Sequence, residues 1–397
     1  MTQSLIIVAF AADQPWSPRG ERALEVCAAA LRIAPTVLIS PSPSGFARRN
    51  LRRLTHVVSP LVLDPWEPEA WWTLRRRRER PGGALLVGFP FSAVYWAARW
   101  LVSEDVPYLV DLGDPWALTL PMGERPAMGG SRAARCERFV WRHAAAGLVT
   151  TRLQAEALRE LFPELPFIVR PNGYRRTRCV ARTPSQSRES ERRTLRLVHY
   201  GNLYEPRLDI VPLLAGLARS GHWDSVVLTQ QGEDWTGALR AAPPEVQIEF
   251  TRPRPWEDVV EAAGQHDLAV VVGNRNPAQL PSKVVQYLTL PIPRLAVVGG
   301  KPSDALTEYV RDKPGWLTLP RDTPTDLAAC AVAAHVQRDW RPEELLAPAQ
   351  ESWDAVAGVL LDAILNYTAV AARSTRRADP DSRHVAAPGS GRPRRQW

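Results

Sequence analysis

The 397-residue chain contains very little lysine. Of its 50 basic residues only three are lysine, namely Lys283, Lys301 and Lys313. Arginine is the default cation everywhere else, so the abundance of arginine reflects overall composition and says little about function.

Cysteine is scarce as well, and the few cysteines lie far apart. No Cys-x-x-Cys pair and no cysteine–histidine spacing of a zinc site occurs. This excludes a disulfide framework and predicts reduced, buried thiols. The four cysteines are Cys27, Cys136, Cys179 and Cys330.

Long uncharged apolar runs are also missing. No stretch reaches the roughly 18 to 20 apolar residues of a membrane-spanning helix, and the nearest approach, residues 85–102, contains Arg99 and Pro90. The first residues, MTQSLIIVAFAADQ, lack the basic start of a signal peptide. We therefore expect a cytoplasmic protein.

The positive charge is concentrated at the C-terminal end. The net charge is +8, and residues 371–397 contribute +5 of it through seven arginines and two aspartates. The remainder carries only +3, which argues against nucleic acid as a partner because such binding needs a basic face on the folded domain. With few apolar residues, 371–397 is predicted to be a disordered basic tail.

Buried strands and amphipathic helices alternate along the rest of the chain. SLIIVAF (4–10) has the continuous apolar character of a strand in a parallel sheet, and ERALEVCAAALRI (21–33) repeats its apolar residues at helical spacing. The alternation continues to residue 173, which predicts an α/β domain over 1–173.

A polar segment, 174–194, then reads as a linker, and the alternation restarts in a second α/β domain over 195–346. Residues 347–370 form one last predicted amphipathic helix, with Trp353, Val356, Leu360 and Ile364 on one stripe. In doubly wound domains ligands bind outside the carboxyl ends of the strands, so a cleft between the domains is the expected site.

Two strand ends in the second domain carry candidate phosphate-binding residues. Gly201 follows the strand LRLVHY, and Arg207 precedes the next helix. Ser282 and Lys283 stand at the start of a predicted helix, with Ser282 as N-cap. A lysine in an arginine-rich chain indicates a need for a compact ammonium group. The alternatives are an ordinary turn with a solvated arginine and a capped helix that covers the sheet.

In the first domain, Asp111 and Asp114 close the strand PYLVD and are expected to enter the cleft. There they could bind substrate hydroxyls or act as a general base. The alternative is a turn with a helix cap.

These stretches together resemble the GT-B glycosyltransferases, specifically the GT4-like group. The resemblance rests on GNLYEPRLD and PSKVVQYLTLPIPRLAV in the second domain, and on PWSPRGERALEV, PYLVDLGDPW and RPNGY in the first. It covers about residues 4–370. It implies two Rossmann-like domains facing an interdomain cleft, with the last helix crossing back to the N-terminal domain.

The resemblance also implies roles for individual residues. Acceptor-side residues would be Arg19, Gly20 and Asn172. The candidate catalytic residues Asp111 and Asp114 would match the family's Asp-containing strand end, although the family reaction requires no side-chain nucleophile. The donor, a nucleotide-diphosphate sugar, would be bound by Gly201, Asn202, Arg207, Arg252, Ser282, Lys283 and Gln286. The expected reaction moves the sugar with retention to a saccharide, lipid-linked or natural-product acceptor, and it needs neither a metal nor a cofactor.

The chain departs from the family pattern at four positions. Gln286 and Ala278 stand where the family has glutamates, with Asn274 or Asn276 as substitutes for the second, and the family's basic residue after the glycine is Asn202. The family's aspartate after the Asn-Gly turn is Tyr174. Two alternatives follow: a catalytically degenerate binding or partner subunit, and a sugar-nucleotide epimerase of the same fold, which would need acid and base side chains.

One segment has no role in this scheme. Trp71 and Trp72 precede four consecutive arginines, Arg75 to Arg78. This combination is typical of a solvated helix, but tryptophan and arginine together also suit contact with an anionic membrane. The second interpretation would place the protein peripherally at the inner membrane face.

Overall fold

The computed structural model describes most of the two predicted domains. The described residues are 4–9, 18–40, 67–75, 81–88, 91–114, 116–118, 130–175, 193–203, 209–300, 303–345 and 347–377. Arg207, Arg76 to Arg78, most of the predicted linker and the predicted tail from residue 378 lie outside them.

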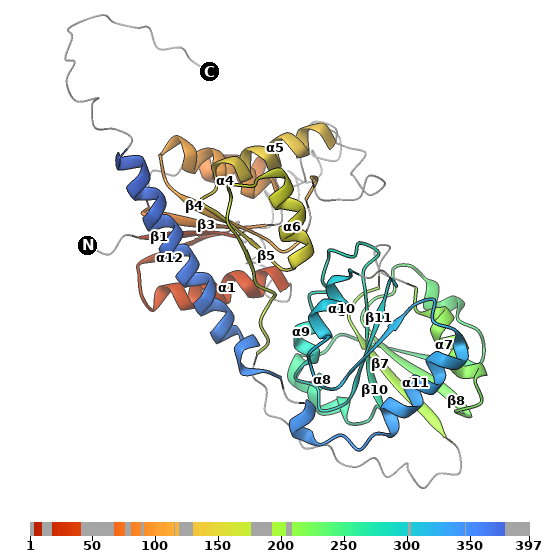
Figure 1. Ribbon diagram of the computed structural model, residues 1–397. Helices are drawn as coiled ribbons and strands as arrows, with labels where there is room; N and C mark the ends of the chain where they lie inside the picture. The colour runs from red at the N-terminus through yellow and green to blue at the C-terminus, as the bar shows by residue number, and fades with distance from the viewer. Residues whose placement is uncertain are drawn as a thin grey trace, which may run out of the picture.

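The first domain is built on a parallel sheet of six strands (Figure 1). Strands β1, β3, β4 and β5 are buried along their whole length, which explains their continuous apolar sequences. From edge to edge the strands are β2 (Thr36–Ile39), β1 (Leu5–Val8), β3 (Gly83–Val87), β4 (Tyr108–Leu112), β5 (Ala146–Val149) and β6 (Phe167–Val169).

Helices cover both faces of this sheet. One face packs against α1 (Pro18–Leu31) and the C-terminal helix α12 (Trp353–Arg377). The other face packs against α3 (Glu67–Arg75), α4 (Phe91–Ser103), α5 (Gly130–His143) and α6 (Arg152–Leu161).

The second domain has a second six-stranded parallel sheet. Numbered within the domain, its strand order is the 3-2-1-4-5-6 order of the doubly wound dinucleotide-binding fold. The order reverses between β7 and β10, so a ligand is expected at the carboxyl ends of these two strands. The strands are β9 (Val246–Thr251), β8 (Ser225–Gln231), β7 (Thr194–Tyr200), β10 (Leu268–Val272), β11 (Arg294–Val298) and β12 (Trp316–Pro320).

Two apolar clusters flank this sheet as well. One contains α7 (Val211–Arg219) and α11 (Thr325–Gln337), and the other contains α8 (Trp256–Ala263), α9 (Val284–Tyr287) and α10 (Ala305–Val310). Short 3₁₀ turns complete the chain at Ala238–Ala241, Pro342–Leu345 and Ala349–Glu351.

Helix α12 crosses back to the first domain (Figure 1). The four residues of the predicted stripe are all buried there. The predicted bounds of 347–370 were wrong at both ends: a 3₁₀ turn delays the helix to Trp353, and alanine and arginine, which favour helices, extend it to Arg377. Within the described residues, Trp353–Val370 is the one segment long and apolar enough to span a membrane, although 44% of it is buried in the protein.

The two chain crossings between the domains run side by side. Tyr174 pairs with Ser352 in an isolated parallel bridge, and the Tyr174 hydroxyl donates to the carbonyls of Ala347 and Pro348. A Cβ atom on Gly173 would lie 2.7 Å from Trp353 Cα, so glycine permits this close approach.

Candidate functional site

A glycine directly follows each of two neighbouring strands, β7 and β8, of the second sheet. Gly201 follows β7 with φ of 141°, and Gly232 follows β8 with φ of 133°, a region that favours glycine. A Cβ atom on Gly232 would lie 2.4 Å from the carbonyl oxygen of Gly201. The two turns therefore pack backbone against backbone. The sequence pointed to Gly201 and missed Gly232, whose signal is its place after the strand VVLTQQ.

Lys283 lies beside the Gly201 turn. A Cβ atom on Gly201 would be 3.7 Å from Lys283 Cδ, so the lysine stem runs along the glycine. The structure thus brings together one lysine and one glycine turn from two different strand ends. Arg207, the predicted companion of Lys283, lies outside the described residues.

The predicted helix N-terminus at Ser282 is wrong. Helix α9 has four residues, its N-cap is Lys283, and among the described residues no side chain caps it. The Val284 N–H instead donates to Pro281 O at 3.0 Å, which closes a tighter turn before the helix. A helix dipole needs several aligned peptides, so the positive field at this point comes from Lys283 rather than from the helix.

Two buried groups hold the α9 segment against the sheet. The Tyr287 hydroxyl accepts the Tyr200 N–H at 2.6 Å and donates to Val270 O at 3.0 Å, so it joins α9 to both β7 and β10. Arg294 is 1% exposed. Its guanidinium donates to the carbonyls of Tyr287, Leu288, Leu290, Pro314 and Leu345.

No local sequence pattern predicted the role of Arg294. An arginine at the start of a strand is ordinarily solvated, and here it replaces water as the partner of the turn that follows Gln286.

Glu21 of α1 meets this region from the first domain. Its Oε1 pairs with Arg175 Nε at 3.0 Å, and its Oε2 accepts a 3.5 Å hydrogen bond from Gln286 Nε2. Burial raises the pKa of Glu21 above its ordinary value, and the positive charges of Arg175 and Lys283 oppose this shift. Sequence reasoning missed Glu21, because only the fold shows that the first turn of α1 faces the second domain.

Further contacts join the domains near the end of β10. Gln279 Nε2 donates to Asp114 Oδ1 at 2.8 Å, and Thr151 Oγ1 donates to Ala278 O at 2.7 Å. Asn274 and Asn276 are buried and hydrogen-bond within their own loop, to Gln279 O and the Ala278 N–H respectively. They therefore shape the loop that reaches Asp114.

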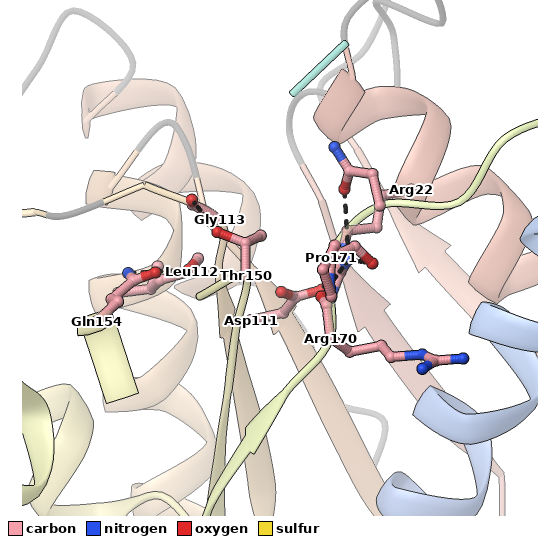
Figure 2. Close-up of polar contacts among 9 residues, drawn as sticks. Arg22, Asp111, Leu112, Gly113, Thr150, Gln154, Arg170 and Pro171 are labelled. Atoms are coloured by element: carbon pink, nitrogen blue, oxygen red, sulfur yellow. Dashed lines mark hydrogen bonds and ion pairs between the residues drawn. The ribbon is translucent and has the colours of Figure 1, made fainter. Parts of the chain in front are cut away.

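Asp111 does not project between the domains as expected. It is 1% exposed, and its Oδ2 pairs with Arg22 Nε at 2.6 Å (Figure 2). Arg22 Nη1 also donates to the carbonyls of Arg170 and Pro171 and to Asn172 Oδ1. The pair thus fixes the Asn172 turn, and the geometry favours a positioning role for Asp111 over a catalytic one.

The remaining predicted site residues are spread around these groups. Gly20 is buried in the first turn of α1, and the side chain of Arg19 lies outside the described part. Asn202 is exposed, and its Oδ1 accepts the Glu233 N–H at 3.0 Å. Arg252 is exposed beyond the end of β9.

Comparison with known proteins identifies the fold. No protein-family model and no curated protein matches the sequence. Among solved structures, HepE of Anabaena in complex with UDP and glucose matches with a TM-score of 0.55 at 11% identity, covering 94% of this chain and 99% of HepE.

Two glycosyltransferases match similarly. The lipopolysaccharide outer core galactosyltransferase WaaB matches with a TM-score of 0.55 at 13% identity, covering 92% of this chain and 99% of WaaB. A glycosyltransferase from Rickettsia africae matches with a TM-score of 0.53 at 10% identity, covering 96% and 99% of the two chains. The chain therefore has the GT-B fold, with two Rossmann-like domains.

Proposed function

We propose that the protein is a glycosyltransferase of the GT4-like type that transfers a sugar from a nucleotide-diphosphate donor. The observation that carries the proposal is the meeting of Lys283 with the Gly201 turn at the point where the strand order reverses. HepE, which shares the fold, has been solved with UDP and with UDP-glucose, which makes uridine nucleotides the first donors to test.

In this reaction the diphosphate is the leaving group, and its negative charge grows as the glycosidic bond breaks. Lys283 would stabilise that charge together with backbone N–H groups near Gly201. We propose transfer with retention, in which the leaving diphosphate takes the acceptor proton, so that no cofactor or metal is required. The acceptor is a saccharide, a lipid-linked sugar or a natural product.

Ligand-induced thermal stabilisation tests this proposal directly. Purified protein is melted with UDP, GDP, ADP and their glucose or mannose conjugates, because a ligand that binds the native state raises Tm. We expect the ligands with one particular nucleobase to raise Tm more than the others do. Lys283→Ala and Arg207→Ala should each weaken diphosphate binding by about ten- to a hundredfold, since a charge-assisted phosphate contact contributes about 1.5–3 kcal/mol.

The matched control is Arg219→Ala. Arg219 is exposed at the last turn of α7, which leads to the start of β8 and so lies at the amino ends of the strands, and its loss removes the same charge. Unchanged diphosphate affinity in both site variants would place the donor elsewhere and favour a non-catalytic partner subunit.

Glu21 supports one other candidate activity. A sugar-nucleotide epimerase needs a titratable side chain beside the sugar, and Glu21 is such a group at the domain boundary. The UDP-GlcNAc 2-epimerase of Methanocaldococcus jannaschii also matches, with a TM-score of 0.50 at 11% identity over 92% of this chain. An epimerase would convert a sugar nucleotide without any acceptor, whereas a transferase would not.

A further inference from the structure

Glu21 occupies an unusual position for a carboxylate. Its side chain is only 12% exposed, yet it lies at the boundary between two domains rather than inside one core. Placing a carboxylate in such a setting is costly unless it is paired, and Arg175 supplies the pairing through Oε1 alone. Within the described part of the chain, the second oxygen, Oε2, accepts the long 3.5 Å bond from Gln286, and the Trp353 side chain also interacts with the carboxylate.

That second oxygen still has acceptor capacity. An ionised carboxylate oxygen accepts about two hydrogen bonds, and the 3.5 Å contact from Gln286 is longer than the usual N–H···O distance of about 2.7–3.2 Å. A ligand hydroxyl would be a better donor to Oε2 than the amide of Gln286 is in this geometry. A phosphate would be repelled, because it carries the same sign of charge.

The α9 segment sets the direction of such a ligand. Lys283 and Gln286 are three residues apart, a spacing that places both side chains on one face of a helical turn, with Cβ atoms about 5–6 Å apart. Lys283 lies beside the Gly201 turn, whereas Gln286 lies against Glu21. The face thus has a cationic end for phosphate and an amide–carboxylate end for hydroxyl groups.

We propose that Glu21 binds hydroxyl groups of the nucleotide sugar from the first domain, as one unit with Gln286, and so makes donor recognition depend on both domains. This inference rests on the proposed nucleotide-sugar function and specifies which residues select the ligand. The hydroxyl groups belong either to the ribose or to the transferred sugar, and both present the same chemistry to a carboxylate.

The test compares Glu21→Gln with Glu25→Gln by titration calorimetry. Glu25 lies one turn further along α1 and also pairs with Arg175, at 3.4 Å, so its variant removes the same charge and shares the same partner. The ligands are inorganic pyrophosphate, UDP and UDP-glucose, replaced by the matching set if another base is preferred. Thermal melts of each variant establish that it is folded.

We expect Glu21→Gln to weaken UDP-glucose binding by about tenfold, which corresponds to about 1.4 kcal/mol, because one charge-assisted hydrogen bond to the ligand is lost. Pyrophosphate binding should be unchanged or slightly tighter. Glu25→Gln should change all three affinities by less than about threefold. If UDP weakens as much as UDP-glucose, Glu21 binds the ribose; if UDP is unaffected, it binds the transferred sugar. An equal loss for pyrophosphate would show that Glu21 only supports the structure and would overturn the inference.

An exchange of the two side chains sharpens the test. Gln286→Glu alone places two carboxylates at about the 3.5 Å contact and should weaken UDP-glucose binding through repulsion. The double variant Glu21→Gln with Gln286→Glu restores one amide and one carboxylate and should bind within about threefold of the parent. Tighter binding by Gln286→Glu alone would contradict the proposed pair.

The experiments distinguish a failure of the proposed function from a failure of the inference about Glu21. If the parent protein binds no nucleotide or nucleotide sugar, the proposed function fails and the inference fails with it. If the parent binds UDP-glucose and Glu21→Gln binds it equally well, only the inference is overturned.

Discussion

At the residue scale, the contact between Gly201 and Gly232 is the feature most sensitive to a single methyl group. Gly232→Ala would place Cβ 2.4 Å from the Gly201 carbonyl oxygen and would require alanine to adopt a φ of 133°. We expect a loss of stability of about 2–4 kcal/mol from strain and overpacking together. Because the Gly201 turn must shift, nucleotide affinity should also fall; urea unfolding and calorimetry measure the two effects.

Gly221→Ala is a control that separates the effect of backbone strain from the effect of overpacking. Gly221 has a φ of 73°, but a Cβ atom there meets nothing within 4 Å among the described residues. It should cost only about 1–2 kcal/mol of left-handed strain and leave nucleotide affinity unchanged. Equal effects of the two variants would mean that the glycine contact does not position the site.

At the element scale, periodicity and strand character were enough to predict both sheets. The runs SLIIVAF and DLAVVVG are apolar because β1 and β10 are buried on both faces, so the α/β alternation is encoded locally. The length of α9 was not encoded in this way. SKVVQYLTL has the composition of a longer helix, but α9 ends where the Tyr287 hydroxyl binds the backbone of β7 and β10. Arg294 then binds the carbonyls that follow α9 and also reaches Leu345, 51 residues along the chain.

Local sequence patterns likewise predicted only part of the candidate site. Gly201 and Lys283 stand at strand and helix ends, where sequence patterns are informative, and the structure brings them together. Glu21, Gly232 and Arg294 act through contacts between distant segments, and no local pattern marks those contacts.

A buried glutamate fixes the segment that follows Asp114. Glu137 of α5 is 1% exposed, and its Oε2 accepts the N–H groups of Ala117 and Leu118, both at 2.7 Å. The other oxygen, Oε1, accepts Trp141 Nε1 at 3.2 Å. In Glu137→Gln one amide oxygen can accept the two backbone N–H groups, but the amide nitrogen then faces Trp141 Nε1, and that N–H loses its partner. We expect a loss of about 1–3 kcal/mol by urea unfolding, against less than about 0.5 kcal/mol for the exposed Glu156→Gln.

The stability difference between the parent and Glu137→Gln should also depend on pH. Burial raises the pKa of Glu137 above its ordinary value of 4.5, despite the opposing hydrogen bonds from Ala117 and Leu118. The folded protein therefore holds this proton more tightly than the unfolded chain does. The associated stability is fully present below pH 4.5 and is lost as the pH rises through the raised pKa. The parent's advantage should shrink toward neutral pH, and an advantage that grows instead would mean that the folded pKa is lowered.

At the scale of the whole molecule, two chain crossings and several side-chain contacts join the domains. Helix α12 was expected to cross back because of the resemblance to GT-B glycosyltransferases, and its apolar stripe packs on the first domain. Its pairing with the outgoing chain at Tyr174 was not predicted, because a two-residue bridge leaves no pattern in the sequence. The boundary contacts of Glu21, Asp114 and Thr151 fix how the two sheets present their strand ends to each other.

Exposed tryptophan and arginine side chains lie together on the surface formed by α3 and α4. Trp71 and Trp72 on α3 are 37% and 53% exposed, and Trp71 packs edge-on against Trp96 of α4. Exposed Arg99 lies on the same pair of helices, and Arg75 to Arg78 follow Trp72 in the sequence. Our hypothesis is that this face binds anionic lipid, with tryptophan at the interface and each nearby arginine contributing about 1 kcal/mol.

Sedimentation with lipid vesicles tests whether this face binds anionic lipid. The parent should sediment with vesicles rich in phosphatidylglycerol, remain free with phosphatidylcholine alone, and be released by about 0.5 M salt, which screens surface charges. Trp72→Ala should reduce binding several-fold without lowering Tm, because the side chain is half exposed. Trp235→Ala is the matched control: Trp235 is 68% exposed but belongs to the second domain, so its loss should leave vesicle binding intact. The hypothesis is overturned if the parent sediments with neither vesicle type, or if both tryptophan variants bind vesicles as the parent does. In either case α3 is an ordinary solvated surface that does not bind a membrane.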